Sequence, residues 1–198
     1  MACRLSALCL IFILNTFSAV HAGREIPLTV SLLRGQAYQK VAGDRLFSIS
    51  VGKIDITEGT TILTGLSGIV FLQPEPGVEF RLREESAFGI IASNSFELRK
   101  GIAGLRVSSS PVELSTPHLR LTLQNTLAVI KVNPMLTRVC VIKGGLQFWQ
   151  GRSTEKLLLQ TGHEIAAAQG QVSRAYQFSD ELRYTWYWTT PDREPSLQ

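Results

Sequence analysis

Outside the first 22 residues, the side chains whose types could do chemistry are two histidines, two carboxylate pairs and one cysteine. A catalytic site needs a nucleophile, a base and an orienting partner brought together, and a metal site needs several ligands at regular spacing. His118 follows a proline, His163 follows a glycine, and neither has a second histidine at metal spacing. We therefore expect both histidines to be solvated turn residues.

The carboxylate pairs are Glu84-Glu85 and Glu75 with Glu79. Two carboxylates on either side of a glycosidic bond are what glycoside hydrolysis requires. Both pairs, however, lie at expected turns close to two arginines, so we expect solvated and locally paired charge. The sequence contains no glycine-rich phosphate loop, no GxSxG elbow and no Cys-x-x-Cys pair. It predicts a protein that is not an enzyme, with no catalytic residue, metal site or cofactor.

Residues 1–22 have the pattern of a cleavable secretory signal. One basic residue near the start precedes a mostly apolar stretch from Leu5 to Val20, and Val20-His21-Ala22 gives a small-x-small exit before Gly23. A signal anchor is the alternative, but the stretch is shorter than the roughly 20 residues that span a bilayer. We expect cleavage before Gly23, a periplasmic protein, and no membrane span after cleavage.

The composition of the chain after residue 22 indicates a domain that is stabilised by a hydrophobic core. Cys140 is then the one remaining cysteine, and its neighbours in TRVCVIKG predict a small buried residue, not a reactive thiol. With no disulfide framework, a hydrophobic core must hold the fold. Without Arg4, 19 basic and 16 acidic residues remain, a charge of +3. This mild, scattered excess indicates solubility, and we expect no nucleic-acid partner.

The apolar pattern is that of short β-strands. In VEFRLRE, Val78, Phe80 and Leu82 fall on one face and the charged residues on the other, as in a half-solvated strand. HLRLTLQN repeats this alternation. LAVIKV and VCVIKG are apolar on both faces, which predicts doubly covered central strands. The core is therefore expected to centre on the following residues: Val129, Ile130, Val139 and Val141.

Glycines punctuate the chain at intervals of roughly 6 to 12 residues, the rhythm of short strands joined by tight turns. The rhythm fits a β-solenoid or a sandwich-like fold, and the sequence leaves both open. Between Gly162 and Gly170 the chain is too short for a stable helix, so a final strand pair is expected. The segment Tyr176–Trp188 is expected to form a short helix or a strand flap, and the residues after Thr190 to fray.

Four stretches in order resemble the FecR domain, the periplasmic β-rich module of anti-sigma signalling proteins that is also found in exported proteins. They are EGTTILTGLSG, PGVEFRLREESAFGI, STPHLRLTLQNTLAVIKV, and VCVIKGGLQFWQ followed by LLLQTGHEI. Asn125 stands where the family usually has glycine, and asparagine tolerates the left-handed conformation that such a turn needs. The resemblance implies a single all-β FecR-like domain over residues 23–170 and a signalling or protein-interaction role.

Residues 171–198 form an aromatic-rich C-terminal segment and tail. Exposed rings stack on sugars or on protein partners, and buried rings would instead cap the open end of the β-stack. We expect an envelope protein as partner, or a cell-wall polysaccharide as the alternative, and the sequence leaves the oligomeric state open. The residues predicted to contact the partner or sugar are Trp149, Tyr184, Trp186, Tyr187 and Trp188.

Overall fold

The computed structural model describes residues 24–41, 44–150 and 155–177. Within these ranges the chain forms sixteen strands and no helix, so it contains no helix that could cross a membrane. All sixteen strands belong to one mixed sheet, which confirms the all-β prediction. The expected signal at 1–22 and the tail from residue 178 onward lie outside the described residues.

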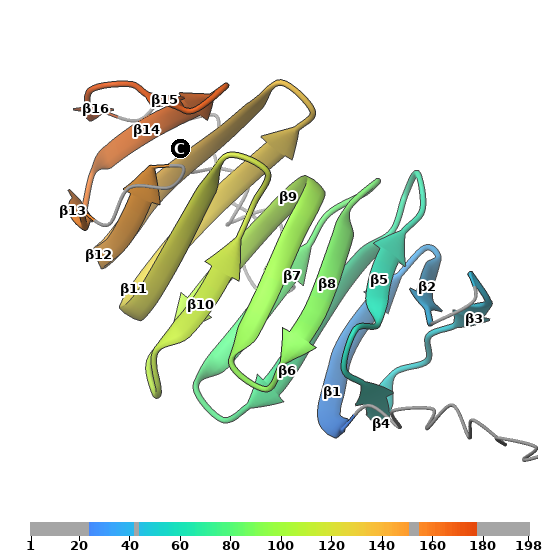
Figure 1. The fold of residues 1–198 in the computed structure, drawn as a ribbon. Helices are drawn as coiled ribbons and strands as arrows, with labels where there is room; N and C mark the ends of the chain where they lie inside the picture. The colour runs from blue at the N-terminus through green and yellow to red at the C-terminus, as the bar shows by residue number, and fades with distance from the viewer. Residues whose placement is uncertain (1–23, 42–43, 151–154, 178–198) are drawn as a thin grey trace, which may run out of the picture.

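The sheet bends back on itself into two layers. The first layer ends in a hairpin at one extreme and in a short strand beside β12 at the other, and Figure 1 shows its strands following one another from blue to red. In spatial order it contains β3 (Leu46–Ser48), β2 (Ala37–Lys40), β5 (Thr61–Thr64), β8 (Ala87–Ala92), the first half of β9 (Ser95–Val107), β10 (Val112–Ser115), the first half of β11 (Leu119–Asn133), the second half of β12 (Leu136–Gln150) and β13 (Leu157–Gln160).

The second layer runs alongside the first. Its pairs are antiparallel, as are those of the first layer except for the parallel pair β9–β10. In spatial order it contains β4 (Gly52–Thr57), β1 (Glu25–Arg34), β6 (Ile69–Glu75), β7 (Val78–Leu82), the remaining halves of β9, β11 and β12, and β14 (His163–Ala168), with β15 (Gln171–Val172) and β16 (Tyr176–Gln177) both pairing with β14.

Three long strands pass from one layer to the other, and each bends at a residue with positive φ. Gly101 in β9 has φ 99°, Asn125 in β11 has φ 50° and Gly144 in β12 has φ 82°. A Cβ at Gly144 would lie 2.1 Å from the Asn125 carbonyl oxygen, so only glycine fits this close approach. The glycine signals that predict turns are therefore, at residues 101 and 144, bends within continuous strands. Asn125 takes the left-handed conformation, as expected.

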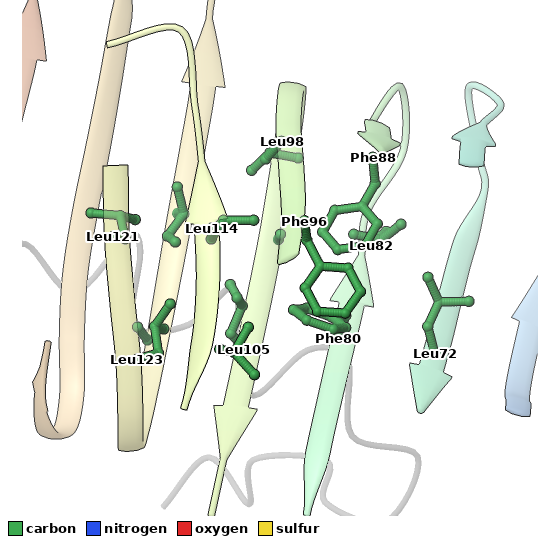
Figure 2. Close-up of a cluster of buried hydrophobic side chains, with 14 of the residues drawn as sticks. Leu72, Phe80, Leu82, Phe88, Phe96, Leu98, Leu105, Leu114, Leu121 and Leu123 are labelled. Carbon is green, nitrogen blue, oxygen red and sulfur yellow. The ribbon is translucent and has the colours of Figure 1, made fainter. Parts of the chain in front are cut away.

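The main core lies between the two layers. Phe80 of the second layer packs against Phe88 and Phe96 of the first, with ring centroids 4.9 and 4.5 Å apart (Figure 2). Such tilted aromatic pairs stabilise beyond the area they bury. Leucines from β6, β7, β9, β10 and β11 extend the same cluster along the stack on both sides of the rings (Figure 2). The two layers are therefore held together by one continuous hydrophobic cluster.

Alternating patterns from the sequence are confirmed on the inner faces. Val78, Phe80 and Leu82 are buried, and so are Leu119, Leu121 and Leu123, whereas Arg120 and Gln124 are exposed. The final strand pair is also confirmed, because residues 163–168 form β14. The four residues expected at the centre of the core, Val129, Ile130, Val139 and Val141, are all 0% exposed.

One part of the core expectation needs refinement. Val129 and Cys140 are buried on the outer face of the second layer, away from the main core, and form a second hydrophobic cluster. Partly buried side chains from the same three strands pack against them, namely Ile102, Leu127 and Ile142. Cys140 is fully buried, as the sequence predicts. The doubly covered strands predicted by LAVIKV and VCVIKG are thus real, and one of their faces lies outside the main core.

Candidate interaction surface

The end of the stack formed by β3 and β4 exposes apolar side chains. Leu46 is 56% exposed, Phe47 46% and Val51 59%, and all three lie within six residues of one another. β3 pairs with β2 alone and β4 with β1 alone among the described strands. Figure 1 shows these strands together at the blue end of the sheet. We call this region, comprising Leu46, Phe47, Val51 and β4, the open end.

Among the described strands, β4 pairs along one edge only, and its other edge lies at the open end. Asp55 faces Pro27 of β1 in the antiparallel register, and proline has no N–H to donate. Hydrogen-bonded and non-hydrogen-bonded pairs alternate along such a ladder, so the Asp55 N–H and C=O point away from β1. The exposed side chains of Lys53 and Asp55 flank this edge, and such charges hinder indiscriminate pairing. An added strand would find its hydrogen-bonding partners here.

Sequence reasoning did not single out the open end. The run LFSISV alternates apolar residues and serines from Phe47 to Val51, as other strands do, and it is followed directly by GKIDIT, in which charged and apolar residues alternate. An edge strand carrying Lys and Asp beside an apolar run is the signal that could have identified it. The predicted contact residues were placed elsewhere.

Of the predicted contact residues, only Trp149 lies within the described part of the chain. It is half-buried on the outer face of the first layer, and the Lys156 ammonium lies 5.2 Å from the centroid of its ring. This cation–π contact occupies a ring that would otherwise be available for stacking on a sugar. The other four, Tyr184, Trp186, Tyr187 and Trp188, lie outside the described residues.

The two histidines differ in their surroundings. His118 is half-buried, and its Nδ1 lies 3.0 Å from the Thr137 hydroxyl, which itself donates to Thr116. His163 is half-buried at the start of β14, with its Nδ1 3.1 Å from the Thr161 carbonyl oxygen. Neither is the fully solvated side chain that was expected. Within residues 24–41, 44–150 and 155–177, no group of three His, Cys, Asp or Glu residues is placed to hold a metal ion.

One carboxylate of each pair is engaged with arginine, as expected. Glu84 accepts two hydrogen bonds from Arg83, and Glu79 forms ion pairs with Arg81 and Arg106. The expectation of full solvation is wrong for Arg81, which is only 5% exposed and lies over the Phe71 ring at 4.8 Å. The Phe71 ring therefore covers part of this guanidinium on the outer face of the second layer.

A second buried ion pair lies on the same face. Glu164 of β14 is fully buried and accepts hydrogen bonds from Arg138 at 2.5 Å and from the Tyr176 hydroxyl at 3.0 Å. Burial and the hydrogen bond donated to Glu164 raise the pKa of Tyr176 above its ordinary value of 10.0. The Glu164 Oε2 atom has no hydrogen-bond partner. The pattern Gly-His-Glu predicts a turn and gives no sign that the glutamate is buried.

Comparison with solved structures finds a similar fold in two crystal structures. Two crystal structures of a "putative anti-sigma factor" from Parabacteroides distasonis ATCC 8503 match with TM-scores of 0.54 and 0.53, at 13% and 14% sequence identity. Each match covers 64% of this chain and 64% and 63% of the respective matched chains, less than two thirds of their length. At this identity the likeness concerns the fold alone. No protein-family model and no curated protein matches the sequence.

Proposed function

We propose that this chain is an exported, non-enzymatic FecR-like module of the cell envelope that binds a protein partner through the open end. The observation that carries the proposal is the edge of β4 that pairs with no described strand, beside the exposed side chains of Leu46, Phe47 and Val51. The ordered resemblance of four sequence stretches to FecR domains and the fold likeness to an anti-sigma factor support a signalling role.

Strand addition is the binding mode that this geometry favours. An extended segment of the partner would pair with the outward N–H and C=O groups of β4, which supply affinity through main-chain hydrogen bonds. The exposed apolar side chains beside the edge would supply additional buried area and select the partner. A secretory signal and a periplasmic location, both expected from residues 1–22, would bring the module to an envelope protein.

Site-specific cross-linking in cells tests the proposal. A photoreactive amino acid at Val51 should trap an envelope protein, and the same group at Met135, which is 65% exposed on the β11–β12 turn, serves as the matched control. A product formed from position 51 and missing from position 135 supports the open end as the contact surface. A chain that stays monomeric and uncross-linked from position 51 would contradict the proposal.

Binding of a cell-wall polysaccharide through aromatic residues is the alternative. It rests on Trp149 and on the four aromatic residues between 184 and 188, and the contact of Lys156 with the Trp149 ring counts against the first of these. Retention of the purified chain on peptidoglycan, reduced in Trp186→Ala and Trp188→Ala variants, would favour this alternative. No retention of the parent protein would exclude it.

A further inference from the structure

The second hydrophobic cluster requires a cover that the described strands do not provide. Val129 and Cys140 are 0% exposed on the outer face of the second layer, and the partly buried apolar side chains packed against them come from β9, β11 and β12. These three strands are neighbours in the same layer. Side chains on one face of a single layer keep part of their surface in contact with water unless something packs over them. The complete burial of Val129 and Cys140 therefore indicates an occupant of this face.

We infer that the occupant is the chain's own C-terminal segment, residues 178–198. One register row crosses the second layer from Val129 to Cys140, then to Glu164 and Tyr176. The last described residue, Gln177, follows Tyr176 in β16 and pairs with His163. The segment therefore starts at the edge of the face that needs covering.

The segment is long enough to cover the cluster. Strands in a sheet lie about 4.8 Å apart, so the three steps from β14 across β12 and β11 to β9 amount to roughly 15 Å. The 21 residues from 178 to 198 could extend over about 65 Å at roughly 3.3 Å per residue. The other segments outside the description fit less well: residues 1–23 lead into β1, which β6 and β7 separate from β9, and residues 151–154 number only four.

The composition of the segment complements the face. It contains four acidic and two basic residues, and the face carries four cations, Arg81, Arg106, Lys131 and Arg138, against two carboxylates, Glu79 and Glu164, which pair with three of them. Aromatic rings over these cations and apolar side chains over Val129 and Cys140 would satisfy both parts of the face. The segment's large apolar residues are Phe178, Leu182, Tyr184, Trp186, Tyr187, Trp188 and Leu197.

Cross-linking within the intact chain tests the inference. A photoreactive amino acid at Ile142, on the outer face of the second layer, should form intramolecular cross-links to peptides from residues 178–198. The matched control is Gln147, which lies on the same strand and is exposed on the outer face of the first layer. Cross-links from position 142 to a second copy of the chain, or to none of residues 178–198, would overturn the inference.

Cys140 provides a second readout, because residues 24–198 contain no other cysteine. A protease site inserted between Gln177 and Phe178 allows the segment to be released after the chain has folded. Release should accelerate alkylation of Cys140 by about tenfold or more, since the thiol loses its cover. Unchanged alkylation after release would contradict the inference, whatever the result at the open end, because that surface lies on β3 and β4.

Discussion

The two halves of β11 share one strand and differ in what covers them. From Leu119 to Gln124, in the first layer, buried leucines alternate with exposed or half-buried polar residues. From Leu127 to Val132, in the second layer, both faces are buried or half-buried. A bend at Asn125 separates the halves. The outer face of the first layer is therefore in contact with water, and that of the second layer is part of a packed surface.

Charged residues have different environments on the outer faces of the two layers. On the first layer the ion pair between Arg99 and Glu97 lies at the surface, with side chains 50% and 31% exposed. On the second layer the ion pair between Arg138 and Glu164 includes a glutamate that is fully buried. The same residue types thus serve solubility on one face and packing specificity on the other.

Introducing a charge into each half of β11 should give the largest difference in stability between the two layers. Val129→Asp puts an unpaired carboxylate into the second cluster, and we expect it to lower the free energy of unfolding by about 4 kcal/mol. Gln124→Asp on the exposed face should lower it by no more than about 1 kcal/mol. Urea denaturation followed by circular dichroism measures both. Equal effects of the two substitutions would show that the outer face of the second layer is open to water.

The bends that join the two halves give the next largest effect. Gly144→Ala combines a positive φ with a Cβ 2.1 Å from the Asn125 carbonyl oxygen, so we expect a loss of about 3 kcal/mol. Gly170→Ala is the control, because its φ is also positive but no atom lies within 4 Å of the added Cβ. It should cost about 1 kcal/mol. Thermal denaturation of both variants separates the effect of the close approach from that of the backbone strain. Similar losses of stability in the two variants would contradict a structural role for the close approach at Gly144.

Substituting one glutamate in each ion pair compares the contributions of the two pairs to stability. Glu164→Gln weakens the buried hydrogen bonds from Arg138 and Tyr176, and we expect a loss of about 2 kcal/mol. Glu97→Gln weakens a partly exposed pair with Arg99 and should cost less than about 0.5 kcal/mol. Chemical denaturation at neutral pH measures the difference. A larger loss for Glu97→Gln would reverse the assignment of the two faces.

The smallest effect concerns alkaline pH. Because the pKa of Tyr176 is raised in the folded chain, its neutral hydroxyl contributes stability that is present below pH 10 and is lost as the pH rises through the folded pKa. Tyr176→Phe should therefore lose less stability than the parent chain between neutral pH and the region above pH 10. Stability measured across this range checks the slope, and parallel curves for the two proteins would contradict the assignment.

The sequence allowed the inner faces of the fold to be predicted and left the outer face of the second layer hidden. Alternation alone identifies Leu119, Leu121 and Leu123 as buried, because each strand carries that information within itself. Arg81 alternates with apolar residues and Glu164 lies between His163 and Ile165, yet both are buried, since their burial depends on neighbours from other strands. Local patterns do not specify such neighbours.

The spacing of the glycines predicts turns but does not indicate which glycines lie where a strand passes from one layer to the other. The sequence predicts turns at Gly101 and Gly144, and the structure places both residues inside long strands that pass from one layer to the other. The open end escaped notice for a related reason. Leu46, Phe47 and Val51 resemble core residues by type, and only the strand order shows that β3 and β4 end the stack.

The central claim, that the open end binds a protein partner by strand addition, is tested most directly by two substitutions at one position. Asp55→Pro removes the outward N–H of β4, whereas Asp55→Ala removes only the side chain. The measurement is the affinity of each purified variant for the envelope protein trapped from position 51. We predict that Asp55→Ala binds as the parent chain does and that Asp55→Pro binds at least about tenfold more weakly. Equal affinity of the two variants, with both folded, would contradict strand addition at β4.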